Sequence, residues 1–282
     1  MNRLRAGLML MAVLHAPMAT AFEVKELATP ESMIVDRRAG GYFVSNINGA
    51  PTEKDGNGFI TKLDGDGRVV ARKFIDGAKG APLHAPKGMA IVGDYLFVTD
   101  IDAVKGYDKA TGALRFNLDL TRYGAVFLND LVRDAQGNLY VTDMMSNFIA
   151  KIEPARAYEI SILAKGDHLG QPNGLAIDPN TNGLVMVNWV EGRVYDVSAT
   201  GALTPRLRQQ FRNLDGVDFD AAGALYFSSL TTGTIYKAAA DGTVTALREG
   251  LTTPADIGVD RERKLLLVPS FDGNFVMTIP LE

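Results

Sequence analysis

Six segments of the chain share one local pattern, and the distance between them constrains the fold more than any other feature. In each, a cap residue and a mostly polar side chain are followed by a small or acidic residue that leads into an apolar strand. Their central positions lie 40 to 56 residues apart, a period typical of β-propeller blades. The segments are Pro30-Glu31-Ser32, Pro86-Lys87-Gly88, Leu128-Asn129-Asp130, Pro172-Asn173-Gly174, Leu214-Asp215-Gly216 and Pro254-Ala255-Asp256.

Each of these segments opens a similar series of strands and turns. In the third repeat, the apolar run 131–133 is followed by a turn that begins with Asp134 and contains Gly137, and then by the strand-like run 139–143. Asp at a turn start bonds the backbone two residues on, and Gly supplies the positive φ of a tight hairpin. Two more β-rich runs complete a repeat. Four antiparallel strands at this period, without a long helix, predict an all-β, six-bladed β-propeller.

The last repeat ends before its outer strand. Its third strand, 275–279, is followed by only three residues, whereas the segment 22–27 alternates apolar and charged residues as a half-exposed edge strand does. We therefore predict that 22–27 pairs with 275–279 and closes the ring. A single propeller domain over 22–282 follows, and a monomer is expected because such a ring buries its core without a partner.

The first 21 residues have the order of a secretory signal peptide. Arg3 and Arg5 precede an apolar run over 6–14, and Ala19-Thr20-Ala21 forms a small-residue cleavage site. We expect a protein exported across the inner membrane, periplasmic or extracellular. The absence of cysteine fits an oxidising compartment. No later apolar run is long enough to span a membrane, and a net charge of −4 argues against nucleic acid as a partner.

Four of the six equivalent positions carry oxygen donors: Glu31, Asn129, Asn173 and Asp215. In a propeller the innermost strands surround one axial channel, so these side chains should face one another. Two carboxylates and two amide oxygens suit one divalent cation, most of all Ca²⁺, with Mg²⁺, Mn²⁺ and Zn²⁺ as alternatives. Asp and Asn also cap strands and turns. A purely structural cap should look alike in every repeat, however, and Lys87 and Ala255 cap nothing.

With these positions in register, the mature chain resembles the senescence-marker-protein (SMP-30)/gluconolactonase/LRE-like family of six-bladed propellers. The resemblance is carried by Glu31 after Pro30, by Asn129-Asp130, by the string from Gln171 to Ala176 and by Asp215-Gly216. It implies that Glu31, Asn173 and Asp215 bind a metal on the axis with Asn129 beside them. It also implies that Asp215 is the general base and that the protein opens a lactone or related ester.

One departure concerns the substrate. Sugar-lactone members of the family have a basic residue two positions before the third-blade Asn, and here that residue is Phe127. Arg would bind hydroxyl or carboxylate oxygens, whereas Phe offers an apolar face, which argues against a polar aldonolactone. We expect Lys87, Phe127 and Asn129 to contact the substrate, with Lys87 either binding an anionic product or balancing the carboxylates.

The sequence leaves a second class of function open. The chain could be a non-catalytic propeller that binds a ligand or protein partner on its channel face, since no confident acid for the leaving group stands out. A metal-free propeller with strictosidine-synthase-like connectivity is disfavoured, because two carboxylates occur in register.

Overall fold

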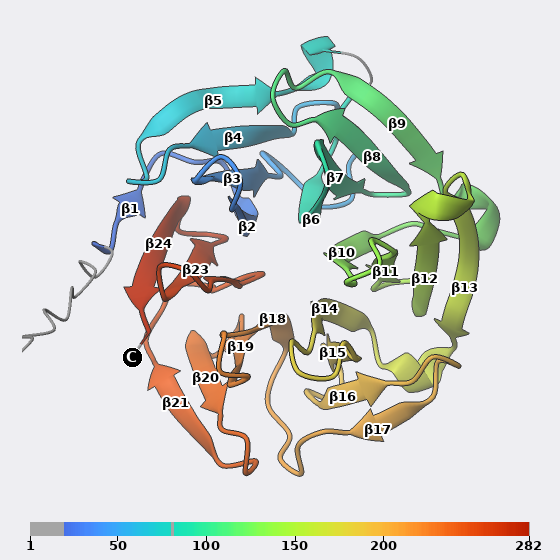
Figure 1. Cartoon of the computed structure of the whole chain (residues 1–282), viewed down its shortest axis with the longest axis vertical. Helices are drawn as coiled ribbons and strands as arrows, with labels where there is room; N and C mark the ends of the chain where they lie inside the picture. Colours follow the sequence, from blue (N-terminus) through green and yellow to red (C-terminus); the bar gives the residue numbers. More distant parts are fainter. Residues whose placement is uncertain (1–19, 80–81, 282) are drawn as a thin grey trace, which may run out of the picture.

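The computed structural model describes residues 20–79 and 82–281, which form six four-stranded antiparallel sheets arranged in a ring (Figure 1). The predicted six-bladed β-propeller is therefore confirmed. The predicted leader falls largely on residues 1–19, which lie outside the described residues. Among the residues that are described, no helix is long and apolar enough to cross a membrane.

Blades one to five each use four consecutive strands, starting at the axis. They are β2 (Pro30–Asp36), β3 (Gly41–Asn46), β4 (Phe59–Leu63) and β5 (Val69–Ile75); β6 (Pro86–Val92), β7 (Tyr95–Asp100), β8 (Ala103–Asp108) and β9 (Leu114–Asp119); β10 (Leu128–Arg133), β11 (Leu139–Asp143), β12 (Phe148–Glu153) and β13 (Glu159–Lys165); β14 (Pro172–Ile177), β15 (Leu184–Asn188), β16 (Val194–Val197) and β17 (Leu203–Pro205); β18 (Leu214–Phe219), β19 (Leu225–Ser229), β20 (Thr234–Ala238) and β21 (Val244–Arg248). Short 3₁₀ turns span Gly77–Lys79, Thr121–Tyr123, Pro154–Arg156 and Asp167–Leu169.

The sixth blade combines both ends of the described chain. Its strands are β22 (Gly258–Asp260), β23 (Leu265–Ser270), β24 (Phe275–Pro280) and, at the outer edge, β1 (Glu23–Val24). Strand β1 is shorter than the segment expected to form it and pairs antiparallel with β24, with Glu23 opposite Met277. The backbone N–H of Phe22 also donates to the Thr278 hydroxyl at 2.9 Å. The ring is thus joined by segments from opposite ends of the sequence.

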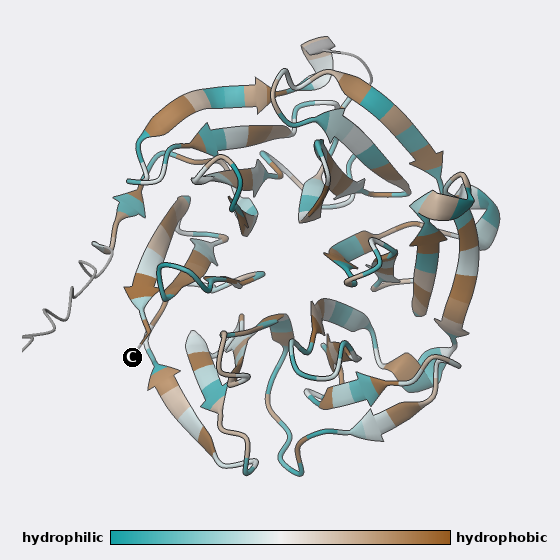
Figure 2. Ribbon diagram, in the orientation of Figure 1, coloured by the Kyte–Doolittle hydropathy of each residue, from teal (hydrophilic) through white to brown (hydrophobic). Residues whose placement is uncertain are grey.

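The core lies between neighbouring blades. Strands such as β9 alternate hydrophobic and hydrophilic residues along their length (Figure 2), so each sheet can pack apolar side chains against the next. Phe97 and Val104 of the second blade, for example, share one buried cluster with Leu139, Val141 and Phe148 of the third. This packing places β2, β6, β10, β14, β18 and β22 around the central axis (Figure 1).

Candidate functional site

The innermost strands of blades one to five contain the same irregularity at the same place. In each, the first strand residue pairs with the end of the second strand, and pairing resumes three residues later after a shift in register. Two residues then oppose one, which is a β-bulge, and bulges redirect side chains. The first bulge residues are the predicted site residues: Glu31, Lys87, Asn129, Asn173 and Asp215.

Hydroxyl groups opposite the bulges connect one blade to the next. Thr99 donates to the carbonyl of Asn129 at 2.6 Å, and Thr142 donates to the carbonyl of Asn173 at 2.8 Å. Thr142 also accepts the N–H of Asp130 within its own blade at 3.0 Å. Each hydroxyl therefore fixes the backbone of a bulge and of the neighbouring site residue. This arrangement needs Ser or Thr at the residue that opposes the bulge.

All five of these side chains are buried, and Asn129 and Asn173 are in direct contact. The Asn129 amide Nδ2 donates to Asn173 Oδ1 at 2.5 Å, and Asn173 Nδ2 donates to the carbonyl of Leu214 at 3.2 Å. Three of the six buried side-chain oxygens that have no hydrogen-bond partner in the described part of the chain belong to these residues: Glu31 Oε2, Asn129 Oδ1 and Asp215 Oδ1. Buried polar atoms are normally paired, so three orphans at equivalent positions indicate that this site accepts a ligand.

The positive charge near the carboxylates of Glu31 and Asp215 does not balance their negative charge. Burial raises the pKa of Glu31 well above its usual value, and Asp215 adds to the rise while Lys87 opposes it. Burial, followed by the charge of Asp130, raises the pKa of Asp215 to about 7. Burial lowers the pKa of Lys87 to about 8, although Glu31 counteracts this effect. A cation bound among these groups would relieve the cost of burying them.

The donor set fits a hard divalent cation. The orphaned oxygens of Glu31, Asn129 and Asp215 are of the kinds that such ions prefer, and Asn173 Oδ1 has a second lone pair beyond the one used by Asn129. The described residues contain no group of three or more His, Cys, Asp or Glu side chains placed to hold a metal ion. A cation here therefore depends on the amide oxygens of Asn129 and Asn173.

Lys87 and Phe127 lie together beside this group. Lys87 is 1 % exposed, and its Nζ donates to the carbonyls of Pro51 and Ala85, both at 3.0 Å. The same nitrogen lies 4.4 Å from the centre of the Phe127 ring. Pro51 belongs to the loop between β3 and β4 of the first blade, so this loop reaches the site. Lys87 is thus held by the protein's own carbonyls and by an aromatic face as well as by its attraction to Glu31.

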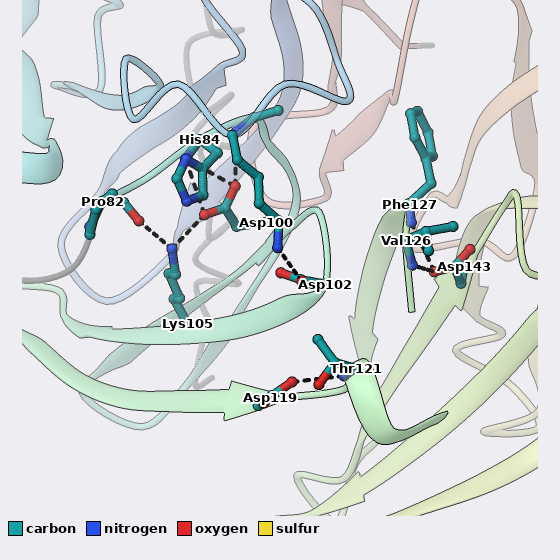
Figure 3. A network of polar contacts seen from close by, with 12 residues as sticks. Pro82, His84, Asp100, Asp102, Lys105, Asp119, Thr121, Val126, Phe127 and Asp143 are labelled. Carbon is teal, nitrogen blue, oxygen red and sulfur yellow. Dashed lines mark hydrogen bonds and ion pairs between the residues drawn. The ribbon is translucent and has the colours of Figure 1, made fainter. Parts of the chain in front are cut away.

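Asp143 positions the loop that carries Phe127. One oxygen of its carboxylate accepts the N–H groups of Val126 at 2.8 Å and Phe127 at 2.9 Å, and the Phe127 ring projects away from this contact (Figure 3). In the second blade, Asp100 has the equivalent role: it accepts the His84 N–H at 3.0 Å and pairs with Lys105 at 2.5 Å (Figure 3). Asp100 and Asp143, the two acidic residues that end a second strand, therefore have a structural role.

Two further buried carboxylates lie at the axis, and sequence reasoning gave them little or no weight. Asp130 accepts the backbone N–H groups of Leu131 and Leu175, both at 2.6 Å, and burial raises its pKa to about 6. Asp256 donates its backbone N–H to the carbonyl of Glu31 at 3.0 Å, and burial, with Asp130 as the next cause, raises its side-chain pKa. One feature of the sequence could have pointed to Asp130. The equivalent position is Gly in three other repeats, so an acidic residue there is unusual.

A recurring apolar position was also missed. An apolar residue follows each second strand, and these residues are Ile47, Ile101, Met144, Trp189, Leu230 and Phe271. Ile47 and Ile101 are buried in a small cluster against which Phe271 packs. Met144 reaches the site, since its sulfur lies 3.7 Å from Asn129 Nδ2. Three large apolar side chains of nearby loops are exposed: Val126 at 51 %, Met145 at 58 % and Val190 at 65 %. In the sequence, this feature is visible as an apolar residue directly after the polar residue that ends each second strand.

Comparison with known proteins agrees with this architecture. The most similar solved structures include virginiamycin B lyase from Staphylococcus aureus, which is 14% identical with a TM-score of 0.64 over 93% of this chain and 89% of that one. A protein of unknown function from Bacteroides thetaiotaomicron is 13% identical, with a TM-score of 0.70 over 94% of this chain and 72% of the other. These identities establish a shared fold. No curated protein matches the chain in sequence.

A family model gives a more specific result. The model described as the SMP-30/gluconolactonase/LRE-like region matches residues 74–257, which is more than half of the chain and includes Asn129, Asn173 and Asp215. The match begins in the first blade and ends in the sixth. The chain therefore belongs to the SMP-30/gluconolactonase/LRE-like family of β-propellers.

Proposed function

We propose that the protein is an exported, metal-dependent hydrolase that opens a lactone or a related ester at the axial site. The observation that carries the proposal is the set of three buried oxygens without partners, from Glu31, Asn129 and Asp215. They come from three different blades and lie among carboxylates whose burial is costly. Glu31, Asn173 and Asp215 would hold the cation, with Asn129 next to them.

The residues of the chain have distinct roles in this proposal. A divalent cation, when bound, would polarise the ester carbonyl and stabilise the charge that develops on its oxygen. Asp215 takes a proton as the water oxygen bonds to the carbonyl carbon, because a carboxylate next to the attacking water can act as a general base. That proton then passes to the leaving alkoxide as the carbon–oxygen bond breaks. The Asn129 amide orients Asn173 through their hydrogen bond.

The surroundings of the site favour a substrate with an apolar body. Phe127 replaces a basic residue, Met144 contacts Asn129, and Val126, Met145 and Val190 are exposed in loops next to Phe127, Met144 and Trp189. Exposed apolar groups that gather at one place usually mark a binding surface. Lys87, beside Glu31, is the only cationic candidate we assign to the carboxylate product. We therefore propose aliphatic lactones or aryl esters rather than polar aldonolactones as substrates.

A combined metal and activity assay tests the proposal. The metal content of purified mature protein is measured first, and a panel of aliphatic lactones, aryl esters and aldonolactones is then assayed with and without chelator. One divalent ion per chain and chelator-sensitive hydrolysis of the apolar esters are expected. Metal-free protein without chelator-sensitive activity would instead support the non-catalytic ligand-binding propeller.

Export is the second part of the proposal, and it rests on the leader-like sequence over 1–21 and on the absence of cysteine. The full chain, expressed in a bacterium with two membranes, should be recovered from the periplasmic fraction with a mass that corresponds to cleavage after Ala21. Recovery of the uncleaved chain from the cytoplasm would contradict it.

A further inference from the structure

A second cavity lies at the other end of the inner strands. It has a volume of about 670 Å³ and is lined by residues 34–38, 89–93, 131–135, 177–179, 182, 218, 258–259, 261, 267 and Lys109. The axial site residues stand at the starts of the inner strands, whereas these lining residues stand at their ends. The lining begins two or three residues after the axial site residues, at Ile34, Met89 and Leu131, and continues to the strand ends. The volume is within the usual range for small-molecule sites.

Neighbouring inner strands pack closely against each other between the level of the axial site and that of the cavity. A Cβ added at Gly88 would lie 2.5 Å from the Cα of Asp130, and one added at Gly174 would lie 2.3 Å from the carbonyl oxygen of Asp215. Only glycine allows neighbouring strands to approach this closely. Ser32 and Asp256 form a further bridge between the first and sixth blades. None of the axial site residues is in the lining of the cavity, so the two sets of residues are distinct.

Most charged groups in the lining are already neutralised. Lys109 pairs with Asp36 at 2.7 Å, and Arg261 pairs with Asp218 at 2.8 Å. Asp178 pairs with Arg206 at 2.6 Å. The fourth lining carboxylate, Asp134, accepts hydrogen bonds from its own turn and from Tyr140. Arg38 reaches outward to Asp94, which is not in the lining.

Two arginines of the lining remain outside these ion pairs, as does the Asp134 carboxylate. Arg37 and Arg133 are exposed, and neither forms an ion pair with a carboxylate of the described residues. Arg133 has one long hydrogen bond, at 3.4 Å, to the carbonyl of Asp134. Burial raises the pKa of Asp218, and Arg261 and also Arg37 oppose this rise. Since Asp218 belongs to the fifth blade and Arg37 to the first, the charge of Arg37 acts across the mouth of the cavity.

The walls between these charges are apolar. One or two half-buried β-branched residues come from each of four inner strands, and they are Ile34, Val35, Ile91, Val92, Val132 and Ile177. We propose that this cavity binds a small organic carboxylate with an apolar body, whose anionic group is bound by the guanidinium groups of Arg37 and Arg133. Guanidinium groups match carboxylates well in geometry and charge, and the apolar walls would hold the rest of the molecule.

Fluorescent dyes test the proposal directly. The anionic probe is anilinonaphthalenesulfonate, and its uncharged counterpart is N-phenylnaphthylamine, which lacks the sulfonate. The double variant Arg37→Gln with Arg133→Gln should weaken binding of the anionic dye at least about tenfold, because charge-assisted hydrogen bonds are lost, and should leave the uncharged dye nearly unaffected. A medium-chain alkyl carboxylate should displace the anionic dye, whereas the alcohol of the same chain length should not.

Two control variants locate the binding. Arg248→Gln removes an exposed arginine from the outer strand of the fifth blade, and Asp215→Asn changes the axial site. Both should bind the anionic dye as the native protein does, and the melting temperatures of the double variant and of Arg248→Gln should be unchanged. The proposal is overturned if the double variant binds the dye normally, if both dyes are lost equally, or if Asp215→Asn abolishes dye binding. None of these results depends on hydrolytic activity, so they do not bear on the proposed hydrolase.

Discussion

At the scale of single residues, the axial site shows how one backbone position serves different chemistry in different blades. Glu31, Lys87, Asn129, Asn173 and Asp215 share the first position of the same bulge. The bulge decides where each side chain points, and the residue type decides what it offers. Orphaned oxygens on three of the five show that their polar groups are not used to satisfy the fold.

Asp215→Asn tests the proposed base. The substitution keeps the shape of the side chain and removes its basicity, so kcat for an apolar lactone should fall about a hundredfold or more. Asp256→Asn is the matched control, because Asp256 is also a buried axial carboxylate but is not assigned to the reaction. Full activity in the Asp215 variant, or an equal loss in both variants, would refute the assignment.

Phe127→Ala tests the apolar substrate. Removing the ring takes away a contact of about 1.5 kcal/mol for an apolar group, so KM for an aliphatic lactone or aryl ester should rise about tenfold. KM for a polar aldonolactone should change little. Steady-state kinetics on both substrate types measure the difference, and Val69→Ala, at an exposed position of the outer strand β5, is the control. An equal change for both substrates would show that Phe127 does not select for apolarity.

At the scale of elements, the second strands of the second, third and fifth blades each support the next blade through a hydroxyl group, from Thr99, Thr142 and Ser228. Thr142 accepts one backbone N–H from its own bulge and donates to the carbonyl of Asn173 in the next blade. Its side chain is fully buried. Contacts between blades therefore fix the backbone of the site, and a single strand could not provide them.

Thr142→Val should destabilise the protein by about 1–3 kcal/mol, because it leaves a buried N–H and a buried carbonyl without their partner. The free energy of unfolding in urea measures the loss. Thr142→Ser retains the hydroxyl and should recover most of the stability. If the Val and Ser variants are equally stable, the hydroxyl does not have the role described here.

Arg206 provides a pH-dependent link in the fourth blade, where it binds Asp178 and Asp196. Burial favours a higher pKa for Asp178, but hydrogen bonds from Arg206 and from backbone N–H groups outweigh it, and the pKa is lowered. A lowered carboxyl pKa stabilises the fold above the pKa of the unfolded chain, and this contribution is lost as the pH falls through the folded value.

Arg206→Gln should therefore lower the free energy of unfolding by about 1 kcal/mol at neutral pH. The difference from the native protein should shrink as the pH falls below about 4, where Asp178 becomes protonated in the unfolded chain. Urea unfolding at a series of pH values measures it. A difference that stays constant down to pH 2 would assign the effect to packing of the arginine stem instead.

At the scale of the whole molecule, the axial site brings together blades that are distant in sequence, so a bound cation would tie the ring together. A ligand that binds only the folded state stabilises it by RT ln(1 + [L]/Kd), about 2.7 kcal/mol at a hundredfold excess over Kd. If the proposed ion is present, chelator should lower the melting temperature by roughly 5–10 °C. The double variant Glu31→Gln with Asp215→Asn should lose this sensitivity to chelator. A melting temperature independent of chelator in the native protein would argue against the ion.

Much of this fold could be predicted from the sequence because its signals are local and repeated. The turn at Asp134 and Gly137 and the recurring segment at each inner strand depend on short-range preferences of the backbone. The six-fold repeat then allows few architectures other than a propeller. The candidate residues Glu31, Asn129, Asn173 and Asp215 could be listed for the same reason, since equivalent positions in a closed ring face one axis.

Only the tertiary structure decided how these residues are used, because the deciding contacts join segments that are far apart in the chain. Asn129 meets Asn173, Lys87 is held by Pro51 and faces Phe127, and Thr142 supports the neighbouring blade. The burial that shifts the pKa values of Glu31 and Asp215 also arises only when the ring closes. Periodicity therefore determined which positions meet, whereas packing between blades determined their partners and the burial of their charges.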